Sequence, residues 1–215
     1  MSVRYYLYVS DSKIDMMLSQ IDPALTRKRT TELSVNLPVL GGRRATESPA
    51  AGERTRRLER VVRHLEDHGD LGSVDDPGQF FWGLLPMRWG PFPSDPTLVY
   101  FAGSTPDTLV GLGGSGNHVL GAPPDPPAVP RSLTPSLLAA LTTHPTIRAL
   151  VEADADGDDQ PDRAALAAVR QANAAMPGPA QNVEFVAKRL LHGPGAGTDG
   201  RAVLLGTPLY VALVD

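Results

Sequence analysis

Apolar residues recur every three or four positions in several segments of this chain, which is the spacing of one buried face of a helix. In the first of these segments the apolar positions are Ile14, Met17, Leu18 and Ile21. A helix is also expected over Arg163–Ala175. The helices that we predict to cover a sheet are Lys13–Ile21, Glu53–His68 and Asn182–Leu191.

Shorter runs, rich in β-branched and aromatic residues, predict the strands of one sheet. Two of these runs, near the C-terminus, are separated by Thr207 and Pro208, which predict the turn of a hairpin. The central run, Thr97–Ala102, is apolar on both faces, so it is expected to be covered on both sides. The predicted strands are Val3–Val9, Gln79–Trp89, Thr97–Ala102, Thr108–Leu112, Val203–Leu205 and Leu209–Val214.

Prolines, glycines and clustered charges mark the connecting segments. Flexible loops are expected at about residues 38–52 and 122–132, and an acidic loop at 152–162. In that acidic loop the glycine and the twelfth position do not fit a calcium-binding EF-hand. The fold class that we predict for residues 1–215 is a single α+β domain with a mixed, mostly antiparallel sheet covered by helices.

Composition excludes several classes of function. The chain has no cysteine, which rules out disulfides, a thiol nucleophile and a thiolate metal site. Its net charge of -4 argues against general nucleic-acid binding. No run of apolar residues is long enough to span a membrane, and the first residues carry no apolar signal segment, so we expect a cytoplasmic protein without a membrane partner.

A glycine-rich stretch that ends in a histidine, residues 111–118, is the first candidate site. Its letters GLGGSG match a dinucleotide fingerprint, but the prolines that follow exclude the helix that such a fingerprint needs. Backbone N–H groups of a glycine-rich loop can still bind an anion. We therefore predict a small anionic or nucleotide-like ligand, bound by Ser10, Lys13, Arg88, Gly113, Gly114, Ser115, Gly116 and Asn117.

An enzyme at the same place is an alternative. His118 would act as the base and Asp11 as its orienting carboxylate or as an acid. The simplest alternative gives these residues no chemical role: the glycines would form a bulge that closes the sheet, and His118 would be an ordinary half-buried side chain. The sequence identifies no cofactor.

The helix predicted over Glu53–His68 offers a third hypothesis. Arginines crowd its polar positions, so the face Arg54–Arg63 could bind a protein partner. His64 and His68 lie four residues apart, but the glutamate between them is at the wrong offset for the metalloprotease motif. Histidines are favoured at a helix C-terminus by the helix dipole, and we predict no metal site.

Four stretches distributed over the chain carry a resemblance to a known group of proteins. They are YYLYVSDSKID, MRWGPF, LGGSGNHVLG and LLGTPLYVALVD. With these stretches the chain resembles an uncharacterised family of actinobacterial proteins, and the resemblance covers about a quarter of its length. That family carries no established activity, so the resemblance implies no catalytic or binding residue.

Overall fold

The computed structural model describes residues 4–21, 49–92, 95–121, 160–195 and 199–214. The chain divides into two compact units. We call Met1–Val9 together with Asp70–Asp215 the barrel unit, and Ser10–Gly69 the helical unit. The predicted flexible loop at 122–132 lies outside the described residues, as do residues 38–48 and 152–159. Residues 49–52 and 160–162 are helical, so the loops predicted at 38–52 and 152–162 end earlier than expected. The prediction of a single domain remains a prediction.

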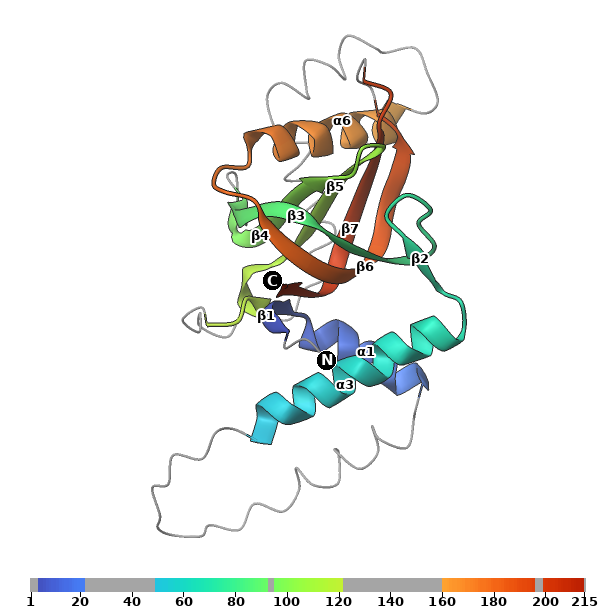
Figure 1. The fold of residues 1–215 in the computed structure, drawn as a ribbon, viewed down its shortest axis with the longest axis vertical. Coiled ribbons are helices and arrows are strands. Elements are labelled where there is room, and N and C mark those ends of the chain that lie inside the picture. The colour runs from blue at the N-terminus through green and yellow to red at the C-terminus, as the bar shows by residue number, and fades with distance from the viewer. Residues whose placement is uncertain (1–3, 22–48, 93–94, 122–159, 196–198, 215) are drawn as a thin grey trace. The chain divides into compact units, whose positions relative to one another are not determined.

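Five strands of the barrel unit close into a ring (Figure 1). Around the ring, β3 pairs with β4, β4 with β5, β5 with β7, β7 with β6, and β6 again with β3. Strands β1 and β2 extend this sheet beside β7 and β3, and only the β2–β3 and β5–β7 pairs are parallel. The seven strands are β1 (Tyr5–Val9), β2 (Leu71–Ser73), β3 (Phe80–Phe92), β4 (Asp95–Ser104), β5 (Thr108–Ser115), β6 (Gln181–Pro194) and β7 (Ala202–Leu213). The α+β class and the mixed, mostly antiparallel sheet are confirmed, and the sheet is a barrel.

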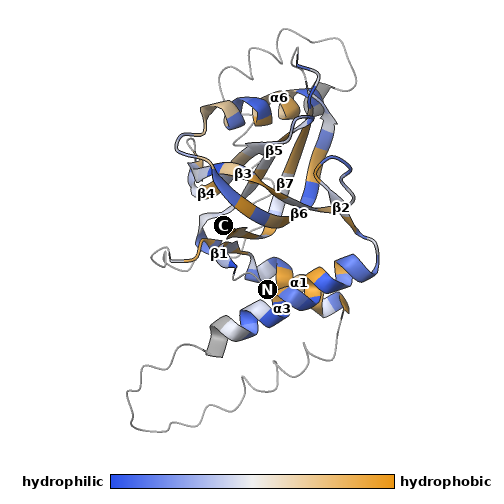
Figure 2. Cartoon of the chain, in the orientation of Figure 1, coloured by the Kyte–Doolittle hydropathy of each residue, from blue (hydrophilic) through white to orange (hydrophobic). Residues whose placement is uncertain are grey.

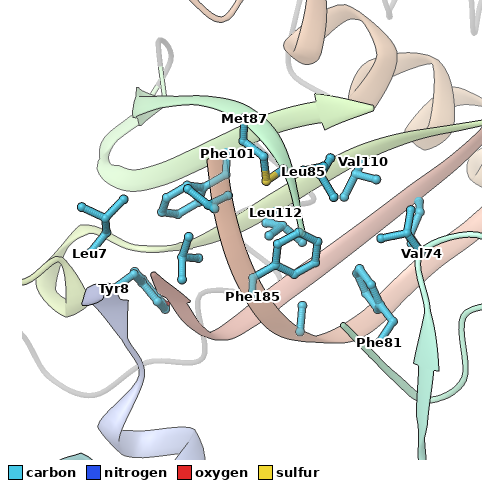
Figure 3. Packing of buried hydrophobic residues seen from close by; sticks show 14 of the residues in the cluster. Leu7, Tyr8, Val74, Phe81, Leu85, Met87, Phe101, Val110, Leu112 and Phe185 are labelled. Atoms are coloured by element: carbon cyan, nitrogen blue, oxygen red, sulfur yellow. The ribbon is translucent and has the colours of Figure 1, made fainter. Parts of the chain in front are cut away.

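Large side chains fill the interior of this barrel (Figure 3). A ring of only five strands is narrow, so inward-facing residues meet at its axis. Several glycines make room for the aromatic rings: a Cβ on Gly206 would lie 2.6 Å from the Phe81 ring, and one on Gly114 would overlap the Tyr8 hydroxyl. The interior cluster includes Tyr8, Phe81, Leu85, Met87, Phe101, Leu112 and Phe185.

Helix α6 (Gln160–Ala175) forms a second core with the outer surface of β4, β5 and β7. The Tyr100 hydroxyl donates to Asn173 Oδ1 at 2.9 Å, and Asn173 Nδ2 donates to the Val110 carbonyl at 2.9 Å. This buried network satisfies polar groups that would otherwise destabilise the contact. Because Tyr100 lies over Gly111, a Cβ at that position would overlap its hydroxyl.

The helical unit contains α1 (Asp11–Ile21) and α3 (Pro49–Asp67). Ion pairs connect the two helices: Arg54 binds both carboxylate oxygens of Asp11, and Arg57 binds Asp15. Figure 2 shows hydrophilic and hydrophobic residues side by side along α3. The buried apolar positions of the pair are Ile14, Leu18, Leu58, Val61 and Leu65.

The helix predicted over Asn182–Leu191 is wrong, because this segment belongs to strand β6. Val183, Phe185 and Ala187 alternate into the barrel interior, and the strand pairs with β3 and β7 along both edges. The same residues also fit a helical spacing, since a short apolar run satisfies both periods. Pairing with β3 and β7, which are distant in the sequence, made this segment a strand instead of a helix.

Two further predictions about the sheet are corrected. The hairpin expected at Thr207–Pro208 is one continuous strand, β7. The pairing register with β6 shifts beside Pro208, and such an irregularity accommodates a residue that has no N–H to donate. The expected glycine-rich loop is largely strand, because β5 continues to Ser115. Of the helices predicted to cover the sheet, Lys13–Ile21 and Glu53–His68 exist as α1 and α3 in the helical unit, whereas the helix packed on the barrel is α6.

Candidate functional site

The glycines of the predicted anion site lie inside the sheet. Gly113 and Gly114 pair with Tyr100 and Val99 of β4. Ser115 ends the strand, and its hydroxyl accepts a hydrogen bond from the Asn117 N–H at 3.2 Å as the 3-10 helix η1 (Gly116–His118) begins. The backbone and hydroxyl groups of this stretch therefore take part in building the barrel.

His118 packs against the barrel core. Its ring meets the Tyr8 ring edge to face, with 5.7 Å between the centroids. The next residues fasten the segment to β1, since Val119 bridges Tyr8 and the Leu120 N–H donates to the Leu7 carbonyl at 2.8 Å. This geometry resembles the alternative in which residues 111–118 close the sheet.

Three predicted site residues, Ser10, Asp11 and Lys13, belong to the helical unit, whereas His118 and the glycines belong to the barrel unit. The Asp11 carboxylate is bound through both oxygens by Arg54, at 3.1 and 3.0 Å. Burial lowers the pKa of Lys13 to about 7. The pairing of His118 with Asp11 stays a prediction.

Arg88 projects from the outer surface of β3. Its Nη1 donates to the carbonyl of Met176, just beyond the last residue of α6, at 3.0 Å. A positive charge at a helix C-terminus is favoured by the helix dipole and by the unsatisfied carbonyls there. This contact gives Arg88 a structural role, which is to tie β3 to the end of α6.

The arginine-rich face of α3 is less basic than its sequence suggests. Arg54 and Arg57 are committed to Asp11 and Asp15 of α1. The exposed charged positions of the helix carry both signs: Glu53, Arg56, Glu59, Arg60, Arg63, Glu66 and Asp67. Mixed charges of this kind are typical of a solvated helix surface.

An apolar surface that the sequence did not reveal runs along the outside of β3. Trp82 and Leu84 alternate with the inward-facing Gly83 and Leu85, and their side chains are 48% and 57% exposed. Pro86 follows on the same outward side and is also exposed. We call Trp82, Leu84 and Pro86 the β3 strip.

The acidic residue beside the β3 strip is paired. Glu184 lies directly opposite Leu84 on β6 and forms an ion pair with Arg4 at 2.8 Å. The Tyr210 hydroxyl donates to Glu184 Oε1, the same oxygen that Arg4 Nη2 contacts. Burial, and then the bond to Glu184, raise the pKa of Tyr210, so this hydroxyl keeps its proton. The group connects Arg4, just before β1, with β6 and β7, and it leaves no unpaired charge on Glu184.

The β3 strip could not be identified from the sequence, because both sides of β3 are apolar. In FFWGLLPMRWG the inward positions are Phe81, Gly83, Leu85 and Met87, and the outward ones include Trp82 and Leu84. An alternation of apolar and polar residues, which would have separated the two sides, is absent there. The glycine between two large apolar residues was the only available signal.

Among the described residues, no helix is long and apolar enough to cross a membrane, and no group of three or more acidic or histidine side chains could hold a metal ion.

Comparison with known proteins gives one match. The model of DUF7019, a family of unknown function, matches residues 4–215. No curated protein and no solved structure matches the chain.

Proposed function

Because the chain belongs to the family of unknown function DUF7019, we propose from the geometry that its barrel unit is a protein-binding module whose docking surface is the β3 strip. This makes the chain a protein–protein interaction component, with the contact on the barrel instead of the arginine-rich helix. The observation that carries the proposal is the half exposure of Trp82 and Leu84 in the middle of a long, well-paired strand.

Exposure of large apolar side chains has an energetic meaning. Fully burying a leucine side chain stabilises by roughly 1.5–3 kcal/mol, and about half of this remains available at Leu84. Tryptophan is enriched among the residues that dominate binding energy at interfaces, because it combines a large apolar area with a single N–H donor. The two side chains are two residues apart on one strand, so a partner would cover both at once.

The surroundings of the strip indicate the chemistry of the partner. Glu184 is neutralised by Arg4, and Arg88 is engaged with the end of α6. The three residues of the strip carry no charge themselves, so they attract a partner by short-range apolar contact. We therefore expect a protein that presents apolar side chains to a narrow strip, with an interface toward the small and transient end of the usual range.

The barrel interior favours this function over a buried ligand site. Phe81, Phe101 and Phe185 are completely buried there, together with other apolar side chains. The glycines of β5 pair with β4 and receive aromatic rings from within the barrel. A small-molecule site or a His118–Asp11 enzyme at residues 111–118 stays a prediction that these contacts do not favour.

A site-specific photo-crosslinker tests the proposal. The crosslinker replaces Leu84 in the full chain inside the native cell, and a matched variant carries it at Arg163, an exposed residue of α6. We expect a discrete adduct from position 84 that disappears when Trp82→Thr is added, and none from position 163. An adduct of twice the chain mass would identify a second copy as the partner. The same adducts from both positions, or none from position 84, would contradict the proposal.

A further inference from the structure

We propose that His64 and His68, at the end of α3, form a two-histidine binding site for a borderline transition-metal ion, Cu²⁺ first and then Ni²⁺ or Zn²⁺. Their spacing in the sequence alone does not indicate this site. The argument rests on how the two imidazole rings are placed and on which nitrogen of His68 carries a hydrogen. It concerns the helical unit only and is independent of the function proposed for the barrel.

The first step is the relation of the two rings. His64 and His68 are one helical turn apart, and their ring centroids are separated by 3.9 Å with an angle of 33° between the planes. Side chains four residues apart lie on the same side of a helix. Here the rings already lie together as a tilted stack, and rotation about their χ2 angles would turn one nitrogen of each toward a common ion.

The second step is the tautomer of His68. Its Nδ1 lies 2.8 Å from the His64 carbonyl oxygen, which can only accept a hydrogen bond. Nδ1 therefore carries the hydrogen, and in the neutral ring the lone pair is on Nε2. Histidines that bind metals usually donate their second ring N–H to a carbonyl or carboxylate in this way, which fixes the ring and raises its basicity as a ligand.

The third step is the rigidity of the helix end. The backbone N–H of His68 donates to the same His64 carbonyl at 3.2 Å, so the helical turn continues through both histidines. Gly69 follows with a φ of 70° and donates to the Glu66 carbonyl at 3.2 Å. Glycine in the left-handed region is a common helix C-cap. The cap holds the turn that carries both rings.

The favoured ions follow from the ligand chemistry. Neutral imidazole suits Cu²⁺, Ni²⁺ and Zn²⁺, and for a given nitrogen site affinity is highest for Cu²⁺. No third acidic or histidine ligand joins the pair among the residues that the structure describes. The remaining coordination positions would then be taken by water, which predicts modest affinity and an ion that stays open to further ligands.

The alternative account is that both histidines are at the helix C-terminus for the favourable interaction with the dipole. That account explains why histidines occur there, but it requires neither the approach of the two rings nor the donation by Nδ1. The dipole favours any positive charge at this helix end, so it gives no reason for the two histidines to bind one metal ion together. The two accounts differ in what happens when a metal ion is added.

The experiment is calorimetric titration of the full chain with CuCl₂, NiCl₂ and ZnCl₂. His64→Gln removes one ligand. His68→Asn removes the other, because the asparagine amide can still donate to the His64 carbonyl from the position of Nδ1 but offers no nitrogen in place of Nε2. His192→Gln, at an exposed histidine of β6, is the matched control. We expect each of the first two variants to weaken Cu²⁺ binding about 10-fold or more and the control to leave it unchanged.

Electron paramagnetic resonance of the Cu²⁺-loaded parent chain gives a readout that does not depend on any variant. Two imidazole nitrogens should couple to the copper, and only one in His68→Asn. Absence of Cu²⁺ binding at about 1 mM, equal affinity in the parent and both variants, or a spectrum without two nitrogens would overturn the proposal.

Discussion

Two parts of the barrel's outer surface differ in whether a helix covers them. On β4, β5 and β7 the outward residues are covered by α6, and Tyr100 is completely buried with its hydroxyl bonded to Asn173. On β3, Trp82 and Leu84 are about half exposed. Both surfaces are apolar in sequence. An apolar outward face on a strand therefore indicates a surface that another element covers. That element can be absent from the described part of the same chain.

The covered surface depends on small residues. Gly111 leaves space for the Tyr100 ring, and Ala168 of α6 is 1% exposed at the contact. Asn173 then closes the contact with hydrogen bonds to Val110 and Gly103. The β3 strip lacks both features, because its outward residues are large and bring no buried polar partner. This contrast leads to three predictions.

The largest effect is expected for Gly111→Ala. The added Cβ would overlap the Tyr100 hydroxyl. This hydroxyl cannot move without losing its hydrogen bond to Asn173 and disturbing the packing of α6. Overpacking of this kind costs about 3 kcal/mol of the free energy of unfolding. Gly90→Ala, on β3, is the matched control, because a Cβ there meets nothing within 4 Å. Denaturant unfolding of both variants measures the difference, and equal stabilities would refute the packing argument.

An intermediate effect is expected at alkaline pH. Burial raises the pKa of Tyr100, and burial together with the Glu184 contact raises the pKa of Tyr210. The unfolded chain therefore loses these protons first, so stability is fully present below about pH 10 and falls above it. Each tyrosine contributes a slope of up to about 1.4 kcal/mol per pH unit.

Unfolding of Tyr100→Phe and Tyr210→Phe between about pH 9 and 11 checks this slope. Each variant should lose part of the alkaline destabilisation, and Tyr100→Phe the larger part because Tyr100 is the more deeply buried. Tyr5→Phe, at a side chain that is 69% exposed, is the control and should behave as the parent chain. Identical pH profiles for all four proteins would show that the buried hydroxyls do not titrate in this way.

The smallest effect is expected for Leu84→Thr. Threonine retains the preference for a strand, and the leucine is already more than half exposed, so the free energy of unfolding should change by no more than about 0.5 kcal/mol. Partner capture by the strip should nevertheless fall. A large loss of stability, measured by the same denaturant titration, would mean that Leu84 serves the fold and would weaken its assignment to a docking surface.

Most elements could be predicted where the local pattern was unambiguous. Lys13–Ile21 and Glu53–His68 have helical spacing; the first lies within α1 and the second covers most of α3. Thr97–Ala102 and Thr108–Leu112 lie within β4 and β5. The family resemblance is confirmed by the match over residues 4–215, whereas the actinobacterial origin stays a prediction. The candidate site was harder to predict. Gly111 and Gly114 were interpreted as parts of a ligand-binding stretch, but they provide the space that the Tyr100 and Tyr8 side chains occupy.

By itself, the sequence determined the α+β class, the amphipathic helices and the positions of most strands, because these follow from spacing within a few residues. Tertiary structure alone decided that Asn182–Leu191 is a strand, that the sheet closes into a barrel and that Trp82 points outward. The physical reason is that strand pairing joins residues more than a hundred positions apart, such as Gly83 with Phe185, and no local pattern records which partner an apolar strand will find.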